Sequence, residues 1–160
     1  MRKAFVIAGV VVLAAAVPLA VLAARGNFSG NLDLQKARWT TNAVSTSSTQ
    51  WRNLPGLARL PACTLNEVSA TLSVTVGGAP VNFRAVIDGV PEAPMRPGTA
   101  RFDPNGDESF SFTWVGNTAP FEDDDSHVFG IQWRSPTGGT VSLYRGALNL
   151  LYQAGTHNCP

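Results

Sequence analysis

Apolar and hydroxyl-bearing side chains alternate strictly along residues 68–76. The apolar positions are Val68, Ala70, Leu72, Val74 and Val76, and the positions between them are Ser69, Thr71, Ser73 and Thr75. Successive side chains of a β-strand point to opposite faces, so this segment predicts a half-buried antiparallel strand with one apolar face. A helix with the same sequence would scatter these apolar residues around its axis.

The same two-residue period recurs further along the chain. Apolar positions alternate within residues 81–87, 110–114 and 127–133. Two further strands are expected toward the C-terminus, one beginning at Val141 and Leu143 and the last with Leu148, Leu150 and Tyr152. Turn signals rich in Gly, Asp and Pro separate these runs, and the chain holds 15 glycines and 11 prolines. The sequence therefore predicts an all-β domain of seven or eight strands in two packed antiparallel sheets, a jelly-roll or immunoglobulin-like β-sandwich. The pattern leaves the topology open, and it gives no helix after the N-terminal segment.

Residues 1–24 form an apolar leader outside this domain. A short basic start, Met1-Arg2-Lys3, precedes an apolar stretch that runs from Ala4 to Ala24. Small residues near its end fit cleavage by a signal peptidase, and Pro18 would end a leader helix shortly before that point. The alternative is an uncleaved membrane anchor, since the stretch is about long enough to cross a bilayer. Both interpretations predict a secreted or extracytoplasmic domain.

The rest of the chain divides into a polar lead-in, residues 25–44, and the β-sandwich, residues 45–160. Asn, Ser and Thr are frequent over residues 25–50, with a nearly pure Ser/Thr run from Ser45 to Thr49, which predicts a tether or a weakly ordered edge segment. Without the leader, ten basic and eleven acidic residues remain, a net charge of −1. This balance lacks the basic surplus that displaces counterions from DNA or RNA, so we expect no nucleic-acid partner.

The two cysteines, Cys63 and Cys159, predict a disulfide bond. An even pair in an exported domain is most simply an oxidised pair. Closing so long a loop restricts the unfolded chain by roughly 4–5 kcal/mol in the chain-entropy model. The bond would join the start of the first long strand to the end of the chain.

An acidic run at residues 122–125 is the candidate metal site. Glu122, Asp123 and Asp125 supply the hard oxygen ligands that calcium prefers, and a cation would relieve the repulsion between adjacent carboxylates. The alternative interpretation is a solvated loop, where acidic runs are common. Calcium is the one cofactor that the sequence indicates, and residues 122–125 are its one candidate site.

Motifs for catalysis are scarce. The chain has two histidines and no Gly-x-Ser-x-Gly elbow, which argues against a serine hydrolase. His127 begins a strand whose in-phase neighbours are apolar, so we expect a structural histidine at the edge of the core. Carboxylates suited to glycoside hydrolysis are scattered over turns without an obvious pair, at Asp88, Glu92, Glu108 and Glu122.

Aromatic and arginine side chains give the candidate binding residues. Trp114 and Trp133 are in phase with phenylalanines and are predicted to lie in the core, which leaves Trp39 and Trp51 free to be exposed. Arg134 and Arg145 flank the turn at 135–139, and we expect them to face the same sheet surface. Trp51, Arg134 and Arg145 are therefore the predicted binding residues, with a solvated sheet face as the alternative.

Several segments resemble a recurrent closing hairpin of β-sandwich modules. The hairpin segments are His127-Val-Phe-Gly-Ile-Gln-Trp-Arg-Ser, Gly138-Gly-Thr-Val-Ser-Leu and Leu148-Asn-Leu-Leu. Two further pieces fit the pattern: Ser47-Ser-Thr-Gln-Trp51 leading into Leu54-Pro-Gly-Leu57, and Val86-Ile-Asp-Gly89. Together they cover most of residues 45–153. Similar patterns occur in poorly characterised jelly-roll-like modules of bacterial secreted proteins and of phage tail or fibre proteins. The resemblance implies a sandwich with a surface or adhesive role, and it carries over no site residue.

The prediction from the sequence is an exported, non-enzymatic module that binds a glycan or a surface protein. Its basis is a complete β framework without assembled catalytic groups. Two alternatives stay open: a small extracellular hydrolase of polysaccharides that uses carboxylates, and a structural subunit of a larger assembly. A membrane contact is predicted only through the leader, if the leader stays uncleaved. The sequence leaves the oligomeric state undetermined.

Overall fold

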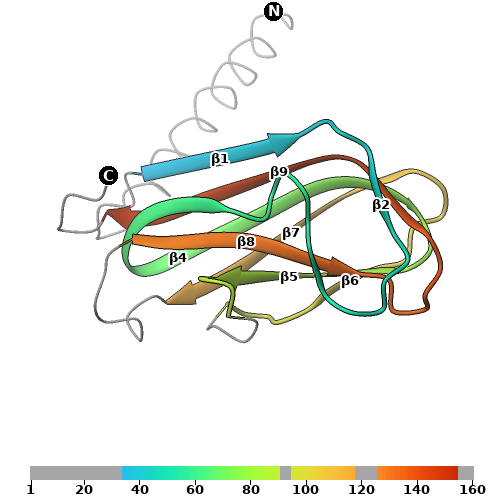
Figure 1. Cartoon of the computed structure of the whole chain (residues 1–160). Coiled ribbons are helices and arrows are strands. Elements are labelled where there is room, and N and C mark those ends of the chain that lie inside the picture. Colours follow the sequence, from blue (N-terminus) through green and yellow to red (C-terminus); the bar gives the residue numbers. More distant parts are fainter. Residues whose placement is uncertain (1–33, 91–94, 118–125, 155–160) are drawn as a thin grey trace, which may run out of the picture. The chain divides into compact units, whose positions relative to one another are not determined.

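The computed structural model describes residues 34–90, 95–117 and 126–154, which form strands and turns without a helix. Within these residues, no helix is long and apolar enough to cross a membrane. Nine strands are present in the described part of the chain (Figure 1). They are β1 (Leu34–Thr40), β2 (Val44–Thr46), β3 (Arg52–Asn53), β4 (Leu60–Gly78), β5 (Val81–Ile87), β6 (Ala100–Phe102), β7 (Glu108–Asn117), β8 (Ser126–Arg134) and β9 (Val141–Ala154).

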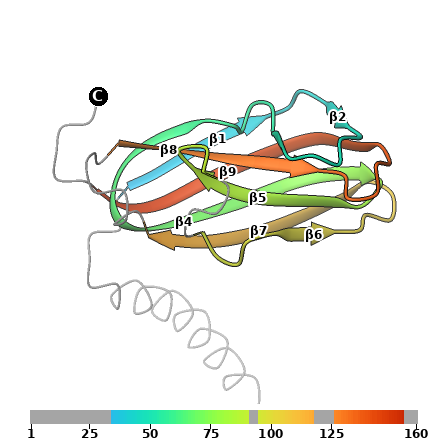
Figure 2. The same ribbon diagram turned by 60° about the horizontal axis from the view of Figure 1, so that its bottom comes forward.

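The strands form two antiparallel sheets. In the first sheet the order is β1–β9–β4–β7, and β2 also pairs with β9. In the second sheet β8 pairs with β5, and β5 pairs with β6. The other side of β8 pairs with β3 and with the first residues of β4. Figures 1 and 2 show the strands stacked in two layers, with β1 and β9 in one and β8 and β5 in the other.

Strand β4 belongs to both sheets. Its residues 60–63 pair with β8, and from Thr64 onward it pairs with β9. An irregularity in the β4–β9 register lies between Thr64 and Val68, at the point where the strand leaves one sheet for the other. Bulges and bends of this kind allow one strand to turn a corner between packed sheets. The predicted all-β fold with two antiparallel sheets in a sandwich-like arrangement is confirmed.

The core lies between the sheets and follows the predicted apolar phase. Leu72 and Leu148 of the first sheet, and Phe83 and Trp133 of the second, are almost fully buried. Trp114 is fully buried, and its indole N–H donates a hydrogen bond to the Gly98 carbonyl at 2.9 Å. The predictions that Trp114 and Trp133 are core residues are therefore confirmed.

The structure differs from the predicted organisation in three places. Residues 34–40 of the lead-in form β1, an edge strand that pairs with β9, so the edge-segment interpretation fits here and the first sheet begins before residue 45. The segment from Val141, expected as two strands, is the single strand β9 with a register irregularity. The strand count is nine in the described residues, not seven or eight, because β1 and the short β2 and β3 carry no apolar alternation.

Candidate functional site

Ser and Thr side chains cover the outer face of the first sheet. Leu72 and Leu148 point into the core, so the residues next to them in the chain, among them Ser73 and Ala147, point outward. Hydroxyl groups pair across β4 and β7 in three successive rows: Thr71 with Thr113 at 2.9 Å, Ser73 with Ser111 at 3.2 Å, and Thr75 with Ser109 at 2.9 Å. These rows are therefore polar, uncharged and paired with each other.

Trp39 stands at one edge of this face. The residue is 72% exposed, the highest value among the large apolar side chains of the described chain. It lies opposite Ala147 in the β1–β9 register, and Ala147 lies opposite Ser73. Since these two neighbours are small, a groove of about 300 Å³ opens beside the indole. Its outward-facing lining includes Trp39, Ser73, Thr75, Ser109, Arg145 and Ala147.

Arg145 lies in this groove and not beside Arg134. We expected the two arginines to share a sheet surface, but Arg134 belongs to β8 in the second sheet and Arg145 to β9 in the first. The turn between β8 and β9 passes from one sheet to the other, which a local hairpin pattern does not reveal. This expectation was wrong.

Trp51 and Arg134 do come together, on the outer face of the second sheet. The guanidinium carbon of Arg134 lies 4.7 Å from the Trp51 ring centre, and that of Arg84 lies 4.3 Å from it. Each such cation–π contact contributes about 0.5–1 kcal/mol at a partly exposed site. The Trp51 ring is therefore occupied by two arginines, which differs from the open stacking surface that a sugar needs. Arg84 was missed by the sequence analysis, although it occupies the polar phase of residues 81–87.

A polar ladder crosses the second sheet next to this cluster. Arg84 Nε donates to Gln132 Oε1 at 2.9 Å, and Gln132 Nε2 donates to Asn53 Oδ1 at 3.1 Å, which links β5, β8 and β3. Beyond the ladder, Asn53, Arg59 and Asp88 help to line a second depression of about 350 Å³. Within the described residues, Arg134 Nε and Asn82 Oδ1 are buried without a hydrogen-bond partner.

His127 is a buried residue at the end of the second sheet. It is 4% exposed, and its Nδ1 lies 2.8 Å from Asp88 Oδ2. The other carboxylate oxygen of Asp88 accepts a 2.7 Å hydrogen bond from the Val128 backbone N–H. Asp88 adopts a φ of 53°, a left-handed conformation that Asp tolerates better than most residues. His127 therefore lies buried at the edge of the core, the position that the apolar phase of its strand predicted.

Replacing Asp88 by Ala is expected to lower the free energy of unfolding by about 1–3 kcal/mol. The change leaves the Val128 N–H and the buried imidazole without this acceptor. Asp88→Asn keeps an acceptor and tolerates the positive φ, so it should cost clearly less. Urea denaturation of both variants measures the difference. Equal stability of Asp88→Ala and the parent protein would contradict the role we give this carboxylate.

Several predicted site residues lie outside the described part of the structure. The acidic run with Glu122, Asp123 and Asp125 is one, so the calcium site stays a prediction. The Cys63–Cys159 bond is another, since neither the Cys63 side chain nor Cys159 is described. Within residues 34–90, 95–117 and 126–154, no group of three or more His, Cys, Asp or Glu side chains is placed to hold a metal ion.

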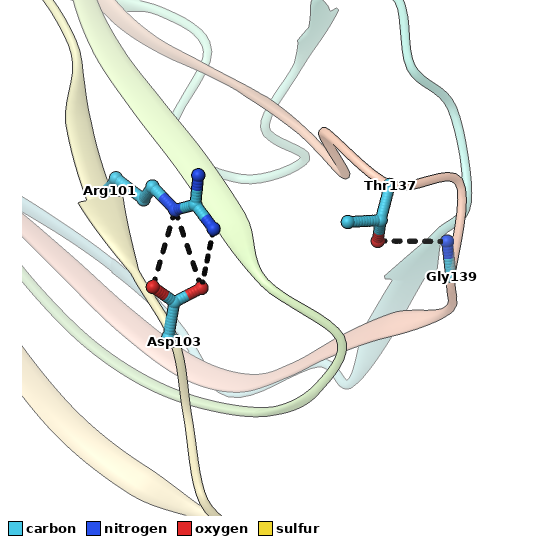
Figure 3. Close-up of polar contacts among 4 residues, drawn as sticks. All are labelled: Arg101, Asp103, Thr137 and Gly139. Atoms are coloured by element: carbon cyan, nitrogen blue, oxygen red, sulfur yellow. Dashed lines mark hydrogen bonds and ion pairs between the residues drawn. The ribbon is translucent and has the colours of Figure 1, made fainter.

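Further polar contacts lie at turns and strand ends. On the second sheet, Arg101 of β6 forms an ion pair with Asp103, 3.1 Å from Nη2 to Oδ1, and the Thr137 hydroxyl accepts from the Gly139 N–H in the β8–β9 turn (Figure 3). A hydrogen bond with Asp107, together with its charge, raises the pKa of the Tyr144 hydroxyl. These contacts stabilise turns and strand ends, and they assemble no reactive group.

Comparison with known proteins adds no family to this description. No protein-family model matches the sequence, and no curated protein is significantly similar to it. The resemblance to bacterial and phage surface modules therefore stays a prediction. The functional interpretation rests on the two sheet faces.

Proposed function

We propose that this protein is an exported, non-enzymatic binding module that holds a polysaccharide on the outer face of its first sheet. The apolar leader supports export, by either cleavage or anchoring. The groove beside Trp39 supports binding, since it joins a flat apolar ring to rows of hydroxyl groups. Sugar rings present both an apolar face and a rim of hydroxyl groups, which this arrangement complements.

The exposed indole of Trp39 is the observation that carries the proposal. Burying an aromatic side chain is among the largest favourable contributions that a folded chain obtains. A tryptophan left 72% exposed on a sheet edge therefore forgoes that contribution in the unbound protein. Exposed Trp residues are enriched where proteins bind their partners. The surrounding face is nearly free of charge, which favours a sugar polymer over a strongly charged protein surface.

The strand order supports a jelly-roll assignment for the sandwich. The first sheet places the last strand, β9, between β1 and β4, with β7 beyond β4. The second sheet places β8 between β3 and β5, with β6 beyond β5. This order pairs first with last strands, as two nested Greek keys do, whereas an immunoglobulin domain pairs its first two strands. Jelly rolls include lectin domains, so the assignment is consistent with binding a glycan.

A hydrolase is the weaker alternative for the described residues. Glu108 lies opposite Val76 of β4, a few residues before β5 begins at Val81. Asp88 directly follows Ile87, the last residue of β5, so the two carboxylates lie near opposite ends of this strand. Seven strand residues span about 23 Å, and catalytic carboxylate pairs stand about 5–10 Å apart. Glu92 and Glu122 lie outside the described residues. The separation of Asp88 and Glu108 favours binding without turnover.

Trp39→Ala is expected to reduce the affinity for polysaccharide by about thirtyfold or more, because truncating an aromatic hot-spot residue typically costs about 2 kcal/mol. The measurement is affinity electrophoresis of the exported domain through gels that contain soluble polysaccharides. Val115→Ala is the matched control, since Val115 is 58% exposed on β7 and does not line the groove. Unchanged retardation of Trp39→Ala, or release of soluble sugar by the parent protein, would exclude the proposal.

A further inference from the structure

We infer that the groove beside Trp39 selects a polysaccharide that carries carboxylate groups, and that Arg145 is the residue that selects it. This inference rests on the proposed function, because it names the class of glycan that binds at the same site. The observations that carry it are the position of Arg145 on β9, the charge of the groove lining and the exposed Trp39 ring in the same groove.

A β-bulge places Arg145 on the outer face. Leu143 is fully buried, so strict alternation would point Tyr144 outward and Arg145 into the core. The register instead pairs Val76 with Leu143 and Thr75 with Arg145, which leaves Tyr144 as an extra residue. Both Tyr144 and Arg145 are consequently exposed. Bulges commonly re-aim a side chain next to a functional site.

Among the residues that the structure describes, Arg145 is the one charged residue that lines the groove. The other lining residues are uncharged, and no acidic residue is among them. Among the described residues, the salt bridges join Arg101 to Asp103 and His127 to Asp88, and no ion pair involves Arg145. Asp107, the acid just before β7, forms a hydrogen bond with the Tyr144 hydroxyl. The groove therefore presents an uncompensated positive charge beside the exposed indole.

The chemistry of these two side chains points to a sugar acid. A guanidinium group presents a planar fork of donors that matches a carboxylate in a bidentate arrangement. The Trp39 ring offers a flat apolar surface within the same groove. A uronic acid residue supplies a carboxylate and a flat sugar ring in one unit. A polyol phosphate chain supplies an anion but no sugar ring, so it would not stack on the Trp39 indole.

The test compares the same polymers with and without their charge. The probes are polygalacturonate, alginate and hyaluronate, each next to its methyl ester, and calorimetry measures binding to the exported domain. We expect at least one acid form to bind tenfold or more tightly than its ester, with an affinity that falls as salt is added. Arg145→Gln should remove that preference, and Arg145→Lys should keep part of it because the charge remains.

Two control variants separate this inference from the proposed function. Arg101→Gln removes an exposed arginine of the second sheet and should leave the preference unchanged. Trp39→Ala should weaken binding of acid and ester alike. Equal affinity for acid and ester, with binding still dependent on Trp39, overturns the inference and leaves the proposed function in place.

Two other outcomes overturn both. The first is the absence of binding to every acid and ester in the set and to neutral polysaccharides. The second is a dimer in light scattering that Trp39→Ala dissociates, because the groove would then be an interface between copies of this chain.

Discussion

Trp114→Ala is expected to lower the free energy of unfolding by about 3–5 kcal/mol. The side chain is fully buried in the first sheet and is among the largest that the described core contains. Its ring packs against Phe112 with 4.8 Å between ring centres, and alanine would leave a cavity there. The Gly98 carbonyl would also lose the indole donor. For a domain of this size, such a loss removes a large fraction of the total stability.

Trp114→Phe separates the two causes. Phenylalanine refills most of the cavity but cannot donate to Gly98, so this variant should cost clearly less than Trp114→Ala. Urea denaturation followed by far-ultraviolet circular dichroism gives both midpoints. If Trp114→Ala unfolds outright, the phenylalanine variant still measures the site. A loss below about 1 kcal/mol for Trp114→Ala would contradict the packing of this strand.

Local periodicity was sufficient to predict the central strands. Each one buries a single face, so the apolar positions of residues 68–76 and 127–133 repeat every second residue and reveal the strand directly. The burial of Trp114, Trp133 and His127 followed from the same phase. The arrangement in two sheets also followed, because a sheet with one apolar face must bury that face against another sheet.

Elements whose structure depends on distant partners could not be predicted in this way. Strand β1 is exposed along most of its length, so residues 34–40 carry no apolar phase, and pairing with β9 alone makes them a strand. The bulge at Tyr144 and Arg145 breaks the two-residue rule, and only the β4 register shows it. The candidate site depends on both of these features. Trp39 lies on the unrecognised strand, and Arg145 follows the bulge.

Local sequence also could not predict which sheet Arg134 and Arg145 belong to, because this depends on the topology of the strands. Arg134 and Arg145 are close in sequence, and a plain hairpin would place them on one surface. In a sandwich, however, a short turn can connect strands of different sheets, as β8 and β9 show. The sequence motif Gln-Trp-Arg therefore predicts a strand and its phase, but not which face of the molecule its arginine supplies.

Gly130→Val is expected to lower the free energy of unfolding by about 3 kcal/mol or more. A Cβ atom at Gly130 would collide with the backbone carbonyl of Ala58. The colliding atoms are backbone atoms, so no flexible side chain can rotate away to relieve the clash. The segment before β4 would have to lift from β8. Its hydrogen bonds from the Leu54 N–H to the Ile131 carbonyl, and from the Ile131 N–H to the Leu57 carbonyl, would break. Leu54 and Leu57, both fully buried, would leave the core, and truncating one such leucine alone costs about 2–5 kcal/mol.

Gly98→Ala is the matched control for this variant. A Cβ atom at Gly98 meets nothing within 4 Å and its φ is not in the left-handed region, so the change should stay within about 0.5 kcal/mol. Urea midpoints of the two glycine variants measure the contrast. A Gly130→Val protein as stable as Gly98→Ala would show that residues 54–59 do not lie against β8. The outer groove beside Trp39 should keep its polysaccharide affinity in Gly98→Ala, because the control leaves both sheets intact.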